Sequence, residues 1–161
     1  MKYAIRVAQM EDMGQVLQLI HELAAFEKEE HAVEITEKDL IADGFGIQKL
    51  FHCFVAEAEA GGGIVGMALV YPRYSTWKGP VIHLEDLIVT KKMRGSGLGS
   101  ALLTEVVKYG SSLGVKRISW EVIDWNEPAI AFYEKKGAKV MRDWDVVQLD
   151  EKGMKAFLIN M

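Results

Sequence analysis

The sequence predicts a single α/β domain, residues 1–161, with a mixed β-sheet covered by helices on both faces. Short runs that alternate polar and apolar residues, as strands do, share the chain with longer runs that have the apolar spacing of helices. These runs occur in the order βααβββαβαβ, with one more strand-like piece near the end, and not as separate strand and helix halves. A length of 161 residues suits one domain, and half of the residues are hydrophobic, as in an ordinary globular protein.

A strand and two helices are expected first. Residues 3–8 alternate as a strand does, and Asp12 is placed to cap the helix that follows. The apolar residues of that helix have helical spacing: Met13, Val16, Leu17, Leu19, Ile20, Leu23, Ala24 and Phe26. A capping box at 36–39 opens a short second helix, which residues 43–46 are expected to end.

Three strands are expected next, at 51–58, 64–71 and 81–89. Residues 59–63 join the first two as a hairpin, because their glycines can adopt positive φ. Pro72 is expected to end the second strand, and 74–80 to form a turn. The third strand carries three ionisable residues in an otherwise apolar stretch, His83, Glu85 and Asp86.

The remaining elements follow a glycine-rich turn at 94–100. A helix is expected over 101–113 and a strand over 116–123. Asn126 should cap a helix at 129–136, with Pro128 in its first turn and Gly137 at its end. Further strands are expected at 138–142 and 144–149, and then a short helix or loop from Asp150.

The turn at 94–100 is the strongest functional signal. Gly95, Gly97 and Gly99 remove side chains from one face, so backbone N–H groups can converge at a helix N-terminus, where the dipole favours an anion. The loop is neither a P-loop, since no Lys follows Gly99, nor a dinucleotide fingerprint, since its third glycine comes one residue too early. The sequence predicts a phosphate cradle; an ordinary strand-to-helix turn is the structural alternative.

Composition argues against several classes of partner. The net charge is −4, and basic residues gather only around Lys91, Lys92 and Arg94, so nucleic acid is not an expected partner. A single Cys53 excludes an intrachain disulfide and suits a reducing compartment. No apolar run reaches 18 residues, which predicts a cytoplasmic protein without a membrane partner. The four histidines lack metal-ligand spacing, so no metal is predicted.

Arg94, Gly97 and Gly99 match the Arg/Gln-x-x-Gly-x-Gly/Ala signature of the GNAT superfamily of acetyl-CoA-dependent N-acetyltransferases, which the chain resembles. Further blocks are similar to its diamine branch, the spermidine/spermine and thialysine acetyltransferases, and Phe26 is closer to the thialysine type. These blocks lie at 23–27, 43–46, 52–53, 77–79, 84–86, 125–126 and 132–133. The resemblance implies a GNAT-like, mostly antiparallel central sheet, acetyl-CoA as co-substrate, and a homodimer.

The resemblance also implies the roles of particular residues. Tyr133 matches the general acid, and Glu85 matches the carboxylate at the amine site. The expected substrate-binding residues are Phe26, Glu27, Trp77, Glu85 and Asp86. The expected cofactor-binding residues are Leu87, Ile88, Val89, Arg94, Gly95, Ser96, Gly97, Leu98, Gly99, Ser100, Asn126, Glu127, Pro128 and Ala129.

These roles fit acetyl transfer to a small cationic amine in a ternary complex. An alkylammonium with a pKa of ~10.4 must lose a proton before it attacks, and the leaving thiolate must gain one. Glu85 can accept the first proton and Tyr133 can deliver the second. Glu27, Glu85 and Asp86 together would attract a second positive charge, which favours a diamine, a polyamine or a thialysine/lysine-like amino acid. Acetylation of a protein or peptide, and a non-catalytic CoA-binding module, remain the alternatives.

Overall fold

A computed structural model describes residues 2–161, apart from the side chain of Ala60. The chain divides into two compact units, Met1–Glu121 and Val122–Met161, and each is described by itself. The elements of the first unit are β1 (Tyr3–Val7), α1 (Met13–Phe26), α2 (Glu37–Phe45), β2 (His52–Ala58), β3 (Ile64–Ser75), β4 (Gly79–Val89), α3 (Leu98–Ser112) and β5 (Ile118–Ser119). Those of the second are α4 (Glu127–Lys135) and α5 (Glu151–Ile159).

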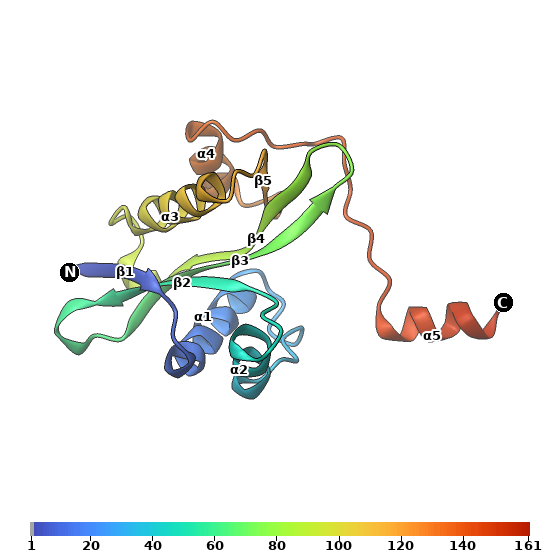
Figure 1. The fold of residues 1–161 in the computed structure, drawn as a ribbon, viewed down its shortest axis with the longest axis horizontal. Helices are drawn as coiled ribbons and strands as arrows, with labels where there is room; N and C mark the ends of the chain where they lie inside the picture. Colours follow the sequence, from blue (N-terminus) through green and yellow to red (C-terminus); the bar gives the residue numbers. More distant parts are fainter. Residues whose placement is uncertain (1) are drawn as a thin grey trace. The chain divides into compact units, whose positions relative to one another are not determined.

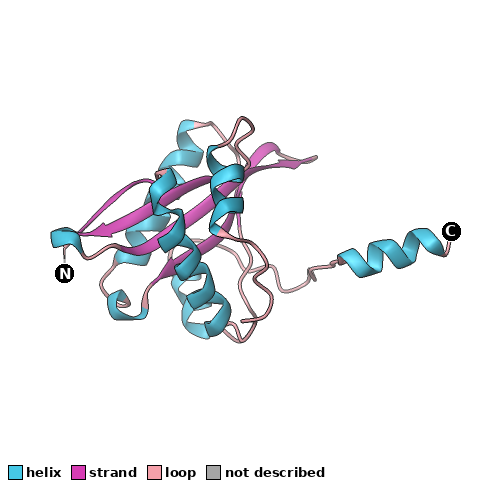
Figure 2. Ribbon diagram, turned by 90° about the horizontal axis from the view of Figure 1, so that it is seen from below, coloured by secondary structure: helices cyan, strands magenta, loops and turns pink. Residues whose placement is uncertain are grey.

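The sheet of the first unit has the order β1-β2-β3-β4-β5. Neighbouring strands are antiparallel except for β4 and β5, which are parallel. Helices α1 and α2 lie on one face and α3 on the other (Figure 1), and the view from below shows helices lying across the strands (Figure 2). The prediction of a mixed, mostly antiparallel sheet with helices on both faces is confirmed.

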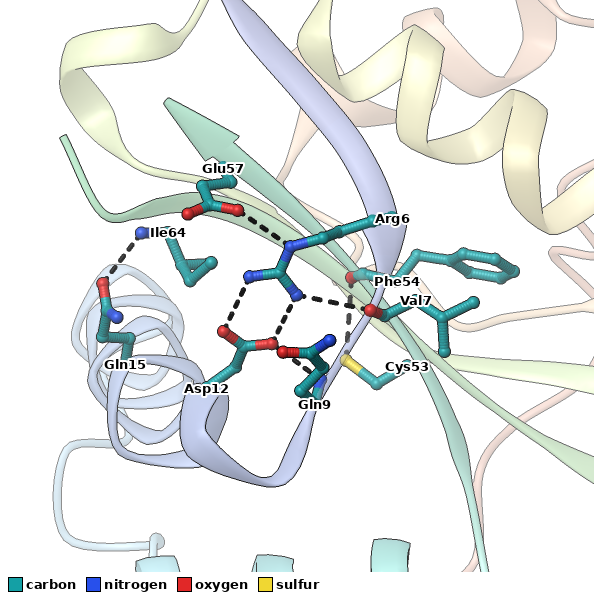
Figure 3. Close-up of polar contacts among 9 residues, drawn as sticks. All are labelled: Arg6, Val7, Gln9, Asp12, Gln15, Cys53, Phe54, Glu57 and Ile64. Atoms are coloured by element: carbon teal, nitrogen blue, oxygen red, sulfur yellow. Dashed lines mark hydrogen bonds and ion pairs between the residues drawn. The ribbon is translucent and has the colours of Figure 1, made fainter. Parts of the chain in front are cut away.

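Helix α1 begins where the sequence predicts, but Asp12 has a different role. Its side chain does not cap α1; it accepts hydrogen bonds from the Arg6 guanidinium at 2.7 and 2.9 Å and from the N–H of Gln9 at 2.7 Å (Figure 3). Arg6 also donates to Glu57 of β2 at 2.8 Å. These bonds hold the pKa of Asp12 below its ordinary value. Asp12 therefore ties β1 to the turn before α1 instead of capping the helix.

The capping box of α2 is confirmed, because the Thr36 hydroxyl accepts the N–H of Asp39 and the Asp39 carboxylate accepts the N–H of Thr36. The expectation for Pro72 is wrong, since β3 continues to Ser75. Strand β2 pairs with β3 only as far as Val70. Beyond that point β3 has a single neighbour, β4, so a residue without an N–H can be accommodated. The turn of this hairpin shrinks to 76–78.

The later elements differ more from expectation. Helix α3 begins at Leu98, three residues earlier than predicted, and β5 spans only Ile118–Ser119. No strand forms at 138–142 or 144–149, so both predictions are wrong. Apolar side chains there stay in solvent, with Val147 92% exposed, because an alternating run becomes a strand only beside a partner strand. The short helix expected after Asp150 forms as α5, and Asp150 caps it.

Candidate active site

The glycine loop lies between β4 and α3. Gly95 and Gly97 have φ values of +76° and +85°, in the left-handed region that glycine adopts without strain. A Cβ atom at either position would meet no atom within 4 Å, so the surface of the loop is open. Gly97 is the N-cap of α3, and no side chain caps this end. Leu98, Gly99 and Ser100 form the first turn of α3. Because no side chain caps this turn, its N–H groups can bind an anion.

Glu22 of α1 anchors the segment that leads into this loop. Its carboxylate accepts the N–H of Lys91 at 2.8 Å and the hydroxyl of Thr90 at 2.9 Å, and lies 3.9 Å from the Arg94 guanidinium. The same guanidinium lies over the ring of Phe26, 5.2 Å from its centroid. The sequence analysis did not identify Glu22. The only sign of it in the sequence is its position one helical turn before Phe26.

The last residues of β4 offer main-chain groups beside the loop. Leu87 and Val89 pair with β3, Ile88 is buried, and the carbonyl of Val89 accepts a hydrogen bond from Arg94 at 3.2 Å. On the opposite edge, β5 pairs with β4 only at Ile82 and His83. Within residues 2–161, the edge of β4 over 87–89 thus has no strand neighbour on that side. An extended polar chain can bind there as a further strand would.

A β-bulge sets the position of Glu85. Leu69 pairs with Asp86 and Val70 pairs with Leu84, so Glu85 has no partner in the ladder. A bulge of this kind bends its strand and redirects a side chain. The bend follows directly after the residues of β4 that pair with β5, which accounts for the short length of β5. The glutamate predicted at the amine site therefore stands at an irregularity in the sheet.

Of the three carboxylates predicted to form an acidic patch, Asp86 is affected by the other two. Burial, followed by the charges of Glu85 and Glu27, raises the pKa of Asp86 to about 6. Burial and the charge of Glu29 raise the pKa of Glu27. Glu27 is also the C-cap of α1, where the helix dipole disfavours a negative charge. A cation bound beside these groups would offset the repulsion between them.

The backbone holds Glu27 in place through a Schellman motif at the end of α1. The N–H of Glu29 bonds to the carbonyl of Ala24 at 2.8 Å, and that of Lys28 bonds to the carbonyl of Ala25 at 3.2 Å. Lys28 takes the left-handed position, with φ +63°, that glycine usually fills. Such strain in a non-glycine residue is typical of functional sites.

Two further residues contact Glu85 and were missed by the sequence reasoning. Tyr71 lies near Glu85; burial, followed by the charge of Glu85, raises the pKa of Tyr71. His83 lies with Nε2 3.7 Å from Glu85, while its Nδ1 is 3.0 Å from the Ser119 hydroxyl and 3.4 Å from Arg73. Tyr71 and His83 pair across the ladder, a relation that no sequence motif discloses.

Trp77 and Phe26, two more of the predicted substrate residues, lie in the turn between β3 and β4 and beside the glycine loop. Trp77 is 79% exposed in the turn of the β3–β4 hairpin, beyond the Ser75–Gly79 pair, and the first unit does not bring it to the carboxylates. Phe26 lies instead under Arg94 of the glycine loop. Burial raises the pKa of the Cys53 thiol to about 12, which keeps this residue from acting as a nucleophile.

The second unit carries the other predicted site residues. Asn126 caps α4, and its side chain accepts the N–H of Ala129 at 3.4 Å. Glu127 begins the helix, and Pro128 lies in its first turn, as predicted. The N–H of Glu127 bonds to the carbonyl of Trp125 at 3.0 Å and Pro128 has no N–H, so the first turn of α4 is already capped.

Tyr133 lies in the last turn of α4. Its ring packs edge-on against Phe132 with centroids 5.2 Å apart. Its carbonyl accepts the N–H groups of Lys136 and Ala138 at 3.0 and 3.1 Å, and Gly137 ends the helix with φ +89°. The phenol is thus attached to a rigid helical turn.

Asp86 gives a stability prediction. The pKa of Asp86 is higher in the folded protein than in the unfolded chain. The contribution of its protonated carboxyl group to the free energy of unfolding is therefore full below about pH 4 and is lost as the pH rises through about 6. Asp86→Asn should raise the free energy of unfolding by up to about 3 kcal/mol at pH 8 and leave it unchanged at pH 4. Urea unfolding at both pH values measures this. Asp43→Asn, at an exposed carboxylate, is the control and should change the free energy of unfolding by less than about 0.5 kcal/mol. Equal unfolding curves for Asp86→Asn and wild type at pH 8 would contradict the prediction.

Comparison with known proteins agrees with the fold and the loop. Residues 15–138 match the acetyltransferase (GNAT) family. The chain is 38% identical over 160 residues to the thialysine N-epsilon-acetyltransferase of Bos taurus, covering 94% of each. It is 34% identical over 129 residues to the L-ornithine N5-acetyltransferase of Arabidopsis thaliana, covering 80% of this chain and 53% of that one. An integron cassette protein of V. cholerae has the same fold, with a TM-score of 0.78, 21% identity and 98% coverage of both chains.

The chain belongs to the GNAT acetyltransferase family. It is an acyltransferase enzyme, and enzymes of this family use acetyl-CoA as co-substrate. The GNAT resemblance inferred from Arg94, Gly97 and Gly99 is confirmed, and so is the resemblance of the further blocks to the thialysine and spermidine/spermine acetyltransferases. No helix among residues 2–161 is both long enough and apolar enough to span a membrane.

Proposed function

We propose that this enzyme transfers an acetyl group from acetyl-CoA to a primary amine of a small substrate that carries a second positive charge. The substrate class is a diamine, a polyamine or a thialysine/lysine-like amino acid. The observation that carries the proposal is that Glu27, Glu85 and Asp86 share one region, where burial and then the charges of Glu85 and Glu27 raise the pKa of Asp86. A dication bound there would relieve the repulsion.

The residues that would hold acetyl-CoA fit its chemistry. The N–H groups at the start of α3 suit the pyrophosphate, and the open edge of β4 over 87–89 suits the amide-bearing arm. Asn126, Glu127, Pro128 and Ala129 are proposed to bind the cofactor again. Acetyl-CoA supplies the activated acetyl thioester.

The reaction then needs two proton transfers by this chain. Glu85 takes the proton of the substrate ammonium, directly or through water, and the amine attacks within the ternary complex. The Tyr133 hydroxyl supplies a proton to the leaving thiolate. Asp86, buried beside Glu85, would hold the amine by charge. No acyl-enzyme is required, which agrees with the protonated, buried thiol of Cys53.

Three wider predictions accompany this proposal. The family match at 15–138 runs from the first unit into the second, which supports one N-acetyltransferase domain over residues 1–161. A homodimer is proposed, and the exposed apolar residues of α5, such as Phe157 and Ile159, are available for a subunit contact. A cytoplasmic location, with no nucleic acid, membrane or metal partner, stays a prediction.

The proposal is tested by thiol release from acetyl-CoA with amines in matched pairs. 1,3-Diaminopropane should have a kcat/KM roughly tenfold or more above that of propylamine, because the acidic patch attracts the second charge. The advantage should shrink as sodium chloride is added. Thialysine and L-ornithine extend the series to amino acids.

Two outcomes would overturn the substrate class. Equal kcat/KM for 1,3-diaminopropane and propylamine at low salt would remove the role of the acidic patch. A lysine-containing peptide that reacts faster than every small amine would favour the alternative, a peptide N-acetyltransferase.

A further inference from the structure

The residues around the bulge of β4 form a chain of polar contacts that ends at Glu85. Arg73 of β3 reaches the Nδ1 atom of His83 at 3.4 Å, and Ser119 of β5 reaches the same atom at 3.0 Å. The opposite ring nitrogen of His83, Nε2, faces the Glu85 carboxylate at 3.7 Å. The His83 side chain is only 6% exposed, whereas that of Glu85 is 53% exposed. A buried ring therefore stands behind an exposed carboxylate.

The chemistry of arginine decides which nitrogen of His83 carries the proton. A guanidinium has N–H donors and no acceptor, so the contact with Arg73 requires Nδ1 to be the acceptor. A neutral imidazole has one donor and one acceptor. The contact with Arg73 therefore favours the tautomer with the proton on Nε2, whose N–H would face Glu85.

The surroundings also keep this ring neutral. Burial is the main cause that lowers the pKa of His83, and the charge of Arg73 lowers it further. The carboxylates of Glu85 and Glu121 act in the opposite direction without outweighing burial. Tyr71, whose ring lies 5.3 Å from that of His83, adds no charge at neutral pH. Protonation of Nδ1 would break the contact with Arg73.

We propose that His83 is a positioning residue for the reaction: its Nε2–H, directed by Arg73 and Ser119, holds the Glu85 carboxylate toward the substrate amine. The separation of 3.7 Å exceeds a hydrogen bond, and such contacts commonly shorten in the complex with substrate. The inference rests on the proposed function of Glu85.

Two substitutions of His83 separate its two nitrogens. His83→Gln keeps an N–H donor near the position of Nε2, and His83→Asn keeps a polar group near Nδ1 but cannot reach Glu85. With the best amine, His83→Gln should retain kcat/KM within about threefold of wild type, and His83→Asn should lose about tenfold or more. The loss should appear in kcat and in the KM of the amine, while the KM of acetyl-CoA stays constant. His31→Asn, at an exposed histidine, is the control and should match wild type.

The proposal would be overturned if His83→Asn and His83→Gln had the same kcat/KM, whether both variants were active or both were impaired. Melting temperatures within a few degrees of one another show that the comparison is between folded proteins.

A measurement without turnover tests the same contact if either variant fails to fold. Long-range ¹⁵N–¹H correlation spectra of the wild-type protein should show His83 protonated at Nε2 at pH 7, and a proton at Nδ1 would overturn the assignment. In Glu85→Gln the ring should titrate at a lower pH than in wild type, because the carboxylate that favours its charged form is gone. An unchanged titration would mean that the two groups do not interact. These spectra do not depend on acetyl transfer, so failure of the proposed function would be seen separately, as wild-type amine kinetics in Glu85→Gln.

Discussion

Replacing Tyr133 with phenylalanine is expected to lower turnover by roughly 10²–10⁴-fold, the usual contribution of a general acid. The substitution removes one hydroxyl and keeps the ring that packs against Phe132. It also keeps the main-chain bonds that end α4. Because the cofactor contacts proposed for this unit are at Asn126 and the residues that follow it, the affinity for acetyl-CoA should hardly change.

Steady-state kinetics with calorimetry of CoA binding measures the two effects separately. Tyr109→Phe is the matched control, since Tyr109 stacks on His52 and has no proposed part in the reaction. Its turnover should equal that of wild type. Wild-type turnover in Tyr133→Phe would remove the phenol from the mechanism.

The second large effect is expected for Glu85→Gln, with a loss of roughly 10²-fold in kcat/KM for the amine. The amide keeps the size of the side chain on the bulge of β4, but it can neither take the proton nor hold the cation. The KM of the amine should therefore rise and kcat should fall together.

The pH dependence separates this variant from Tyr133→Phe. Below the pKa of an amine, ~10.4, each rise of one pH unit increases the free form about tenfold. Moving from pH 7 to 9 should therefore partly restore the rate of Glu85→Gln. The same change should not restore Tyr133→Phe, because a missing proton donor is harder to replace in base. Rates at both pH values for both variants provide the check, and wild-type rates in both would favour a non-catalytic reading of the site.

The parts of this molecule that depend on neighbours in the chain could be predicted from the sequence. The capping box at Thr36 and the Asn126 cap each join groups three residues apart, and the positive φ values of Gly95 and Gly97 depend on the glycines themselves. The matched signature at Arg94, Gly97 and Gly99 identified the family. Each of these signals needs only a few consecutive residues.

The parts that depend on distant partners could not be predicted. Pro72 is tolerated because β2 ends opposite Val70, and residues 144–149 stay irregular because no strand lies beside them. The contact of Glu22 with Lys91 joins residues 69 positions apart, and His83 meets Arg73 across a hairpin. Patterns of neighbouring residues carry no information about such pairs. The sequence therefore predicted the motif residues of the site, but not the residues that hold them in place.

The bulge in β4 has an evolutionary consequence. Leu84 pairs with Val70 and Asp86 pairs with Leu69, two neighbouring residues of β3, so Glu85 is one extra residue between two pairs that would otherwise be consecutive. Deleting this one codon would leave every other side chain of the strand on its present face. The proposed base could therefore be gained or lost in a single insertion or deletion, without the shift of register that such a change causes in a regular strand. Relatives that lack the acid are then expected to differ at this point in length, and not in the identity of the flanking residues.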